Sequence, residues 1–197
     1  MKVLAAMSGG VDSSVTAYLL KTQGHSVTGI TMKLYDGEDE YISKEKSCCS
    51  LDDIQDARRV CDALGIPYYV LNFKDDFKEQ VINKFIHAYE TGHTPNPCID
   101  CNRYMKFSKL LNESIKMELD AVATGHYAQI TKQGDRFLLN KGLDTSKDQS
   151  YVLYSLTQNQ LAHTLLPIGG LTKSEVREIA REQGFINAKK HDSQDIC

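Results

Sequence analysis

The sequence has no apolar run long enough to cross a lipid bilayer, so we expect neither a membrane-spanning helix nor a membrane partner. It shows no basic leader followed by an apolar core and a cleavage site, which favours a cytoplasmic protein over a secreted one. It also lacks an excess of basic charge, because 23 Lys and Arg residues stand against 26 Asp and Glu. Bulk charge therefore does not indicate nucleic-acid binding, and any contact with RNA must come from local basic patches.

A glycine-rich segment, Met7–Ser14, lies between a short apolar run and a helical pattern. Gly9 and Gly10 carry no Cβ, so the backbone there can turn sharply and approach a ligand closely. The unpaired amides of the following helix N-terminus point at an anion, with the helix dipole behind them, and three serines add hydroxyl donors. We therefore interpret residues 8–14, called the phosphate loop below, as a cradle for nucleotide phosphates rather than an ordinary serine-capped turn.

The phosphate loop lacks the lysine of a Walker loop and the spacing of the Gly-x-Gly-x-x-Gly dinucleotide fingerprint. It carries Asp12 where the helix begins. This carboxylate could hold a Mg²⁺ ion that neutralises phosphates, or it could simply complement the helix dipole. The residues alone leave both roles open.

Strand patterns alternate with helical patterns through the first two thirds of the chain, which predicts right-handed crossovers and a parallel sheet. In such a sheet the ligand crevice lies beyond the carboxyl ends of the strands. The phosphate loop, Met32 and Gly125–His126 all follow predicted strands, so we expect them to meet there. Strands are predicted at 2–7, 26–34, 67–73 and 121–124, and helices at 11–22, 51–64, 77–89 and 103–117.

The pattern changes after residue 127. Residues 128–130 and 136–140 flank a Gln-Gly-Asp turn and predict a hairpin. Thr172 and Glu175 form a capping box that begins a helix extending to about residue 183. We place a domain boundary at 142–147, which divides the chain into residues 1–144 and a partial, mixed second domain at 145–197.

Six cysteines in a chain that is expected to be cytoplasmic favour reactive or metal-binding roles over a disulfide framework. Cys98 and Cys101 form a Cys-x-x-Cys pair that follows two prolines and precedes a basic helix. Two such sulfurs can reach one metal or each other, and a helix N-terminus would lower a thiol pKa. Half of a structural zinc site is the alternative, although no second ligand pair lies nearby.

Five motifs in a fixed order resemble the bacterial tRNA-specific 2-thiouridylases, within the PP-loop ATP pyrophosphatase superfamily. The resemblance implies a Rossmann-like, adenine nucleotide α-hydrolase-like fold with a parallel sheet. It also implies a tRNA partner, ATP and Mg²⁺. The motifs are the phosphate loop, Thr94–Asn102, Thr124–Tyr127, Lys147–Tyr151 and Ser193–Cys197.

The same resemblance implies roles for individual residues. Cys101 would be the nucleophile and Cys197 the cysteine that carries a persulfide. ATP would be bound by Ala6, Met7, Ser8, Gly9, Gly10, Val11, Asp12, Ser13, Ser14, Met32 and Gly125, and tRNA by His126, Lys147, Asp148 and Gln149.

The reaction implied is the replacement of the C2 oxygen of a wobble uridine by sulfur. Adenylation by ATP turns a poor leaving group into AMP. In one version a sulfur-donor protein loads Cys197, and a Cys101–Cys197 disulfide remains after transfer. In the other version Cys98, Cys101 and Cys197 hold a [4Fe-4S] cluster whose open iron position binds sulfide. The third cysteine favours the cluster slightly.

Two rival functions stay open on the sequence. A PP-loop amide ligase would adenylate a small carboxylate and would need no sulfur relay. An inactive ATP- and tRNA-binding fragment would perform no chemistry at all. Family members continue past the last cysteine into a β-rich region, so residues 145–197 are expected to begin a truncated tRNA-binding region.

Overall fold

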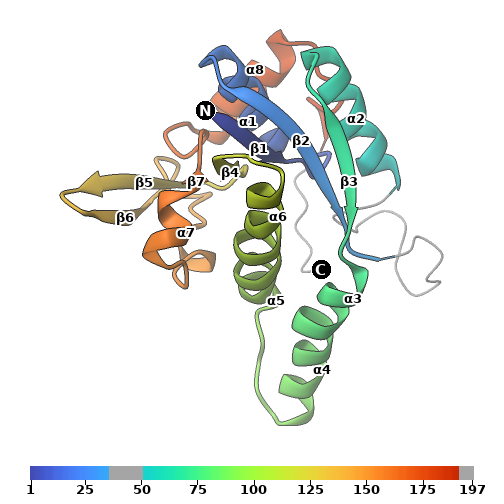
Figure 1. Cartoon of the computed structure of the whole chain (residues 1–197), viewed down its shortest axis with the longest axis vertical. Coiled ribbons are helices and arrows are strands. Elements are labelled where there is room, and N and C mark those ends of the chain that lie inside the picture. Colours follow the sequence, from blue (N-terminus) through green and yellow to red (C-terminus); the bar gives the residue numbers. More distant parts are fainter. Residues whose placement is uncertain (36–50, 191–197) are drawn as a thin grey trace.

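The computed structural model of the chain describes residues 1–35 and 51–190. Within them, a five-stranded parallel sheet has the order β3-β2-β1-β4-β7 (Figure 1). All four strand pairings are parallel, so the carboxyl ends of the strands meet at one edge, as the alternating pattern predicts. The strands are β1 (Lys2–Ala6), β2 (Ser26–Lys33), β3 (Tyr68–Asn72), β4 (Ala121–Ala123) and β7 (Thr164–Leu165).

Strand β1 lies at the centre of the sheet, and its middle residues are completely buried. Successive side chains of a strand point to opposite faces, so Val3 and Ala5 belong to one core and Leu4 to another. On the first face pack α1 (Val11–Thr22), α2 (Leu51–Leu64) and α8 (Lys173–Glu182). Burial on both faces explains why β1 has an uninterrupted apolar sequence.

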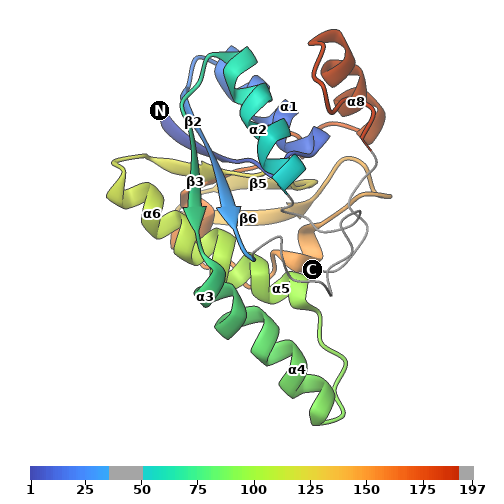
Figure 2. The ribbon, with the colours of Figure 1, turned by 90° about the vertical axis from the view of Figure 1, so that its right-hand side faces the viewer.

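The second face of the sheet is covered by two segments that alternate between α- and π-helical geometry (Figure 2). Figure 2 also shows α4 leading away from the sheet. None of the described helices is long and apolar enough to cross a membrane. The first segment is α3 (Lys74–Phe77), η1 (Lys78–Ile82) and α4 (Asn83–Glu90), and the second is α5 (Pro97–Asp100), η2 (Cys101–Lys109) and α6 (Leu110–Lys116).

The second helical segment begins six residues earlier than the pattern predicts. Asn96 caps it, because its side-chain oxygen accepts a hydrogen bond of 3.1 Å from the amide of Cys98. Pro97 occupies the first turn, where a missing amide costs nothing. The predicted break at 91–97 therefore ends in a helix start, and the cysteine pair lies inside a helix.

Residues after 127 form the predicted hairpin, β5 (Ala128–Gln133) and β6 (Arg136–Lys141), followed by η3 (Ser150–Val152) and α7 (Gln158–Ala162). Strand β7 was not predicted, because two residues carry no periodic pattern. It pairs with β4, while Val176 and Ala180 of α8 pack in the core beside α1. The chain after residue 145 thus contributes to the central sheet and its core, and the division at residue 144 stays a prediction.

Gly9 allows a backbone contact that another residue would prevent. Its φ is +74°, and a Cβ there would lie 2.3 Å from the carbonyl oxygen of Asp53. Gly24 has a similar φ of +81° with no atom within 4 Å of its would-be Cβ. An alanine at Gly24 would therefore suffer backbone strain alone, whereas an alanine at Gly9 would suffer both backbone strain and steric overlap.

We predict that Gly24→Ala lowers the free energy of unfolding by about 1 to 2 kcal/mol, the cost of a left-handed alanine. Gly9→Ala should cost clearly more, because α2 must also move. Urea denaturation of both variants measures the difference. Equal losses of unfolding free energy in the two variants would show that the close contact of Gly9 with Asp53 does not contribute to stability.

Candidate active site

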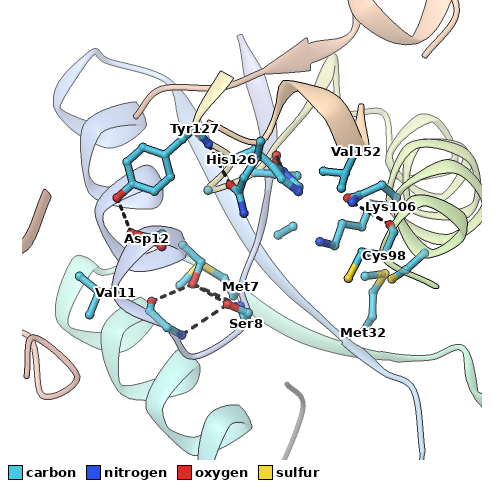
Figure 3. Close-up of a pocket in the computed structure, with 18 of the residues that line it drawn as sticks. Met7, Ser8, Val11, Asp12, Met32, Cys98, Lys106, His126, Tyr127 and Val152 are labelled. Carbon is cyan, nitrogen blue, oxygen red and sulfur yellow. Dashed lines mark hydrogen bonds between the residues drawn. The ribbon is translucent and has the colours of Figure 1, made fainter. Parts of the chain in front are cut away.

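A cavity of about 410 Å³ opens at the carboxyl edge of the sheet (Figure 3). Segments from across the chain line it: the phosphate loop, the end of β2, the cysteine pair, and the residues that follow β4. Figure 3 shows Asp12 and Tyr127 on one side and Cys98, Lys106 and Met32 on the other. Of the residues singled out from the sequence, those lining the cavity are Ala6, Met7, Ser8, Gly10, Val11, Asp12, Ser13, Met32, Cys98, Cys101, Gly125, His126, Lys147 and Gln149.

The other candidates lie behind the cavity wall or outside the described residues. Gly9 packs on α2, and the Ser14 hydroxyl donates to the Gly10 carbonyl at 3.0 Å. Asp148 accepts hydrogen bonds from the Gly142 amide at 2.8 Å and the Ser150 hydroxyl at 2.8 Å, so it orders its own loop. Cys197 falls in the range 191–197, outside the described residues.

The phosphate loop is folded by its own hydroxyl groups. Ser13 Oγ donates to the Gly10 carbonyl at 2.9 Å and accepts from the Ser8 amide at 3.2 Å. Gly10 is the N-cap of α1 and has no side chain with which to cap it. Within residues 1–35 and 51–190, the N-cap of α1 therefore provides no side-chain hydrogen bond to the first-turn amides, which suits an anion site.

Strand β4 ends against the first turn of α1. A Cβ at Gly125 would lie 2.9 Å from the carbonyl carbon of Asp12 and 3.0 Å from the amide nitrogen of Ser13. Real Cβ atoms essentially never come so close to another heavy atom, so only glycine fits. This contact fixes the direction in which the first turn of α1 presents its amides.

The Asp12 carboxylate is held by two side chains from later parts of the chain. The Tyr127 hydroxyl donates to Asp12 Oδ1 at 2.8 Å. Lys173 Nζ lies 2.7 Å from Oδ1 and 2.9 Å from Oδ2. The Lys173 side chain is only 12% exposed, whereas that of Asp12 is 30% exposed. The pair is thus partly shielded from water, which strengthens its electrostatic attraction.

Residues 187–190 support the back of the phosphate loop. Asn187 Nδ2 donates to the Gly9 carbonyl and to Ser14 Oγ, each at 2.9 Å. Lys190 Nζ lies 2.6 Å from Asp53 and 2.8 Å from Asp56 on α2. Burial alone would lower the pKa of Lys190, but its bonds to these two carboxylates raise that pKa above its ordinary value. Lys190 therefore stays charged and ties the chain to α2.

The cysteine pair forms the opposite wall. The Cys98 carbonyl accepts from Asn102 Nδ2 at 2.9 Å, and Cys98 is half-buried. Cys101 is only 8% exposed. Burial raises the pKa of the Cys101 thiol, while the charge of Lys106 opposes that rise. The expectation of a lowered pKa was wrong for Cys101, because burial dominates and the helix N-terminus, at Pro97, lies four residues before it.

A metal site built from three or more protein ligands finds no support among the described residues. Within 1–35 and 51–190, no group of three or more His, Cys, Asp and Glu residues is arranged to hold a metal ion. Cys61, Cys98 and Cys101 are free thiols there. The three-cysteine cluster needs Cys197, so it stays a prediction.

His126 lines the cavity and is itself buried. Its Nδ1 lies 2.7 Å from the Thr124 hydroxyl, and its ring centroid lies 5.9 Å from that of Phe107. Burial, and secondarily the charge of Lys106, hold the pKa of His126 well below its usual value. The imidazole is therefore neutral at pH 7.

The whole chain, residues 1–197, matches the family model described as the tRNA methyl transferase HUP domain. The chain belongs to this family. A tRNA-specific 2-thiouridylase MnmA of Clostridium beijerinckii is 55% identical over 196 residues, which cover 100% of this chain and 55% of that relative. An MnmA 1 of Clostridium botulinum Loch Maree shows the same identity and coverage. The chain thus spans about half the length of the curated relatives it matches.

Solved structures share the fold of this HUP-domain chain. A 4-thiouridine synthetase in complex with RNA and bound ATP has a TM-score of 0.60 at 18% identity, covering 100% of this chain and 44% of that one. An NMN synthetase of Francisella tularensis has a TM-score of 0.55 at 18% identity, covering 97% and 66%. The expected Rossmann-like fold and the resemblance to 2-thiouridylases are both confirmed.

Sequence reasoning gave no site role to Tyr127, which ends one of the motifs, and did not place Lys173, Asn187 or Lys190 at this HUP-domain site. Lys173 follows the capping residue Thr172, which fixes it at the first position of α8. That local signal was visible, but Asp12 lies 161 residues away along the chain. No spacing rule connects positions so far apart.

The three described thiols should differ in reactivity. Burial, with the charge of Asp62, raises the pKa of Cys61 from the ordinary 9.0 to about 12. At pH 8 its thiolate fraction is then about a thousandfold smaller than for an ordinary thiol. We predict that iodoacetamide labels Cys98 first, Cys101 more slowly and Cys61 last in the folded protein, as peptide mass spectrometry can measure. Labelling in urea removes burial and is the control. Labelling of Cys61 as fast as Cys98 would contradict the arrangement.

Proposed function

We propose that this chain is the ATP-binding and adenylating part of a tRNA 2-thiouridylase. The observation that carries the proposal is one cavity lined both by the phosphate loop and by a Cys-x-x-Cys pair. An ATP-dependent sulfur transfer needs those two chemistries within reach of one substrate. The relatives that are 55% identical carry the name tRNA-specific 2-thiouridylase, which agrees with this pairing.

ATP is assigned to the phosphate-loop side of the cavity. The first-turn amides of α1 would hold its phosphates. A carboxylate at the cavity wall suits Mg²⁺, so Asp12 would hold that ion, which neutralises phosphate charge when bound. The assigned residues are Ala6, Met7, Ser8, Gly9, Gly10, Val11, Asp12, Ser13, Ser14, Met32 and Gly125, with Gly9 and Ser14 acting through the loop conformation.

The proposed reaction has three steps. The C2 oxygen of the wobble uridine attacks the α-phosphorus of ATP, and pyrophosphate leaves. The terminal sulfur of a persulfide on Cys197 then adds to C2, and AMP departs with the C2–O bond. Cys101 attacks the Cys197 sulfur, the S–S electron pair goes to the transferred sulfur, and a Cys101–Cys197 disulfide remains. A sulfur-donor protein would restore the persulfide after reduction.

Transfer-RNA is the proposed partner at the cavity. His126 lines it as a neutral imidazole, and Lys147 and Gln149 line it beside Tyr127. Gln149 Oε1 accepts a hydrogen bond from the Tyr127 amide at 3.0 Å. Gln149 therefore also positions Tyr127, whose hydroxyl donates to Asp12. Asp148 would act by ordering this loop.

An iron–sulfur cluster is the alternative sulfur carrier for the same reaction. The thiols of Cys98 and Cys101 fit two of its ligand positions, because residues three apart on a helix share a face. Cys197 would supply a third ligand. A cluster would supply sulfide, while the adenylation by the phosphate loop would be unchanged.

The test is pyrophosphate release by the chain with ATP, Mg²⁺ and unmodified tRNA bearing a wobble uridine. We expect release to depend on tRNA. Asp12→Asn should slow pyrophosphate release by about 100-fold, because the Mg²⁺ ion that neutralises the phosphate charge would lose its carboxylate ligand. Asp135→Asn, at the exposed hairpin turn, is the matched control and should have no effect.

Other outcomes select the rivals. Pyrophosphate release that depends on a small carboxylate instead of tRNA would identify an amide ligase. Binding of ATP and tRNA without any pyrophosphate would identify a module that performs no chemistry. Cys101→Ser should keep pyrophosphate release and lose 2-thiouridine, which nucleoside mass spectrometry can detect.

A further inference from the structure

A buried polar atom without a partner belongs to a residue that lines the cavity. Asn102 lies outside the proposed ATP and tRNA contacts and is only 3% exposed. Its Nδ2 donates to the Cys98 carbonyl at 2.9 Å, which fixes the orientation of the amide, because a carbonyl oxygen can only accept. Asn102 Oδ1 is therefore left as an acceptor, and it has no hydrogen-bond partner within residues 1–35 and 51–190.

An unpaired buried acceptor costs free energy, so its presence in a folded protein needs a reason. Five buried side-chain atoms lack a partner in the described part of the chain, and only Asn102 Oδ1 belongs to a residue that lines this cavity. A ligand that brings a hydrogen-bond donor into the cavity would satisfy that atom.

The same helix also supplies a donor. Lys106 lines the cavity on the side of Cys98 (Figure 3). Asn102 and Lys106 both belong to η2, a π-helix, in which backbone hydrogen bonds join residues five apart. One turn is therefore longer than in an α-helix, and Lys106 reaches the cavity together with Cys101. Asn102 lies four residues before Lys106, so an acceptor and a donor are neighbours on one helix.

The charge of Lys106 also acts on two other groups of the cavity. Burial is the main cause of the raised pKa of Cys101 and of the lowered pKa of His126, and Lys106 opposes the first shift and adds to the second. The ammonium group therefore lies near both. In the proposed reaction C2 of the uridine must meet the sulfur that Cys101 helps to release, so the base belongs in this part of the cavity.

We propose that Asn102 and Lys106 select uracil by contacting two neighbouring groups of the base: Asn102 Oδ1 accepts from N3–H, and the Lys106 ammonium donates to O4. This assignment rests on the proposed function. Cytosine has the same C2 carbonyl, but it presents an acceptor at N3 and an amino donor at N4. It would therefore oppose acceptor to acceptor and donor to donor. Neither contact uses O2, which stays free to attack ATP.

Pyrophosphate release with two tRNAs that differ only in a wobble uridine or cytidine tests the assignment. The unsubstituted chain should act faster on the uridine. Asn102→Leu should lower the ratio of the uridine rate to the cytidine rate by about 10- to 100-fold, because N3–H loses its acceptor and the repulsion of cytosine is removed. Asn112→Leu, the same substitution at an exposed position of α6, is the matched control and should keep the ratio.

Lys106 provides a second arm that leaves the hydrogen bond between Asn102 and Cys98 intact. Lys106→Met should lower the same ratio by about tenfold, the loss expected for one charged hydrogen bond. Lys106→Arg still donates to O4 and should retain most of the ratio. Lys109→Met, at an exposed lysine of the same π-helix, is the control and should keep it.

A purely structural role predicts a different result, because a distorted helix would slow release with both tRNAs equally. An unchanged ratio in Asn102→Leu would overturn the contact with N3–H, and an unchanged ratio in Lys106→Met would overturn the contact with O4. Equal rates with uridine and cytidine in the unsubstituted chain would overturn both contacts while leaving the proposed function in place. Absence of release with either tRNA would overturn the proposed function and this assignment together.

Discussion

The structure depends on a backbone contact that leaves no room for a side chain. Just after β4, Gly125 lies against Asp12 and Ser13 in the first turn of α1, and Gly9 lies closer still to Asp53 of α2. These two contacts fix the turn that joins β1 to α1. The amides of α1 are therefore directed into the cavity before any ligand arrives, which is the preorganisation that electrostatic catalysis requires.

Charge at this turn is balanced by residues distant in the sequence. Lys173 neutralises Asp12 at the front of the loop, and Lys190 neutralises Asp53 and Asp56 behind it. Asn187 adds hydrogen bonds to Gly9 and Ser14. Lys173 begins α8, and Asn187 and Lys190 follow that helix. The last described part of the chain therefore completes the site that the first fourteen residues begin.

Prediction from sequence succeeded where a local pattern determines the structure. The strand–turn–helix at residues 2–22, the hairpin after residue 127 and the capping box at Thr172 all follow local rules, and each is present. It failed for β7, which is too short to have a period, and for the start of the cysteine helix, where the Asn96 cap was not recognised. Most of the residues singled out from the sequence line one cavity, but the Asp12–Lys173 pair spans 161 residues and no local pattern indicates it.

The two walls of the cavity divide the proposed chemistry between them. Cys98 lies on one side of the cavity and Asp12 with Tyr127 on the other, while Cys101 and the neutral His126 also line it. The most direct measurement is a crystal structure of the chain with a non-hydrolysable ATP analogue and Mg²⁺. The account predicts that the phosphates contact the first-turn amides of α1, with the α-phosphate facing the cysteine wall. A nucleotide bound elsewhere, or one whose terminal phosphates face Cys101, would contradict it.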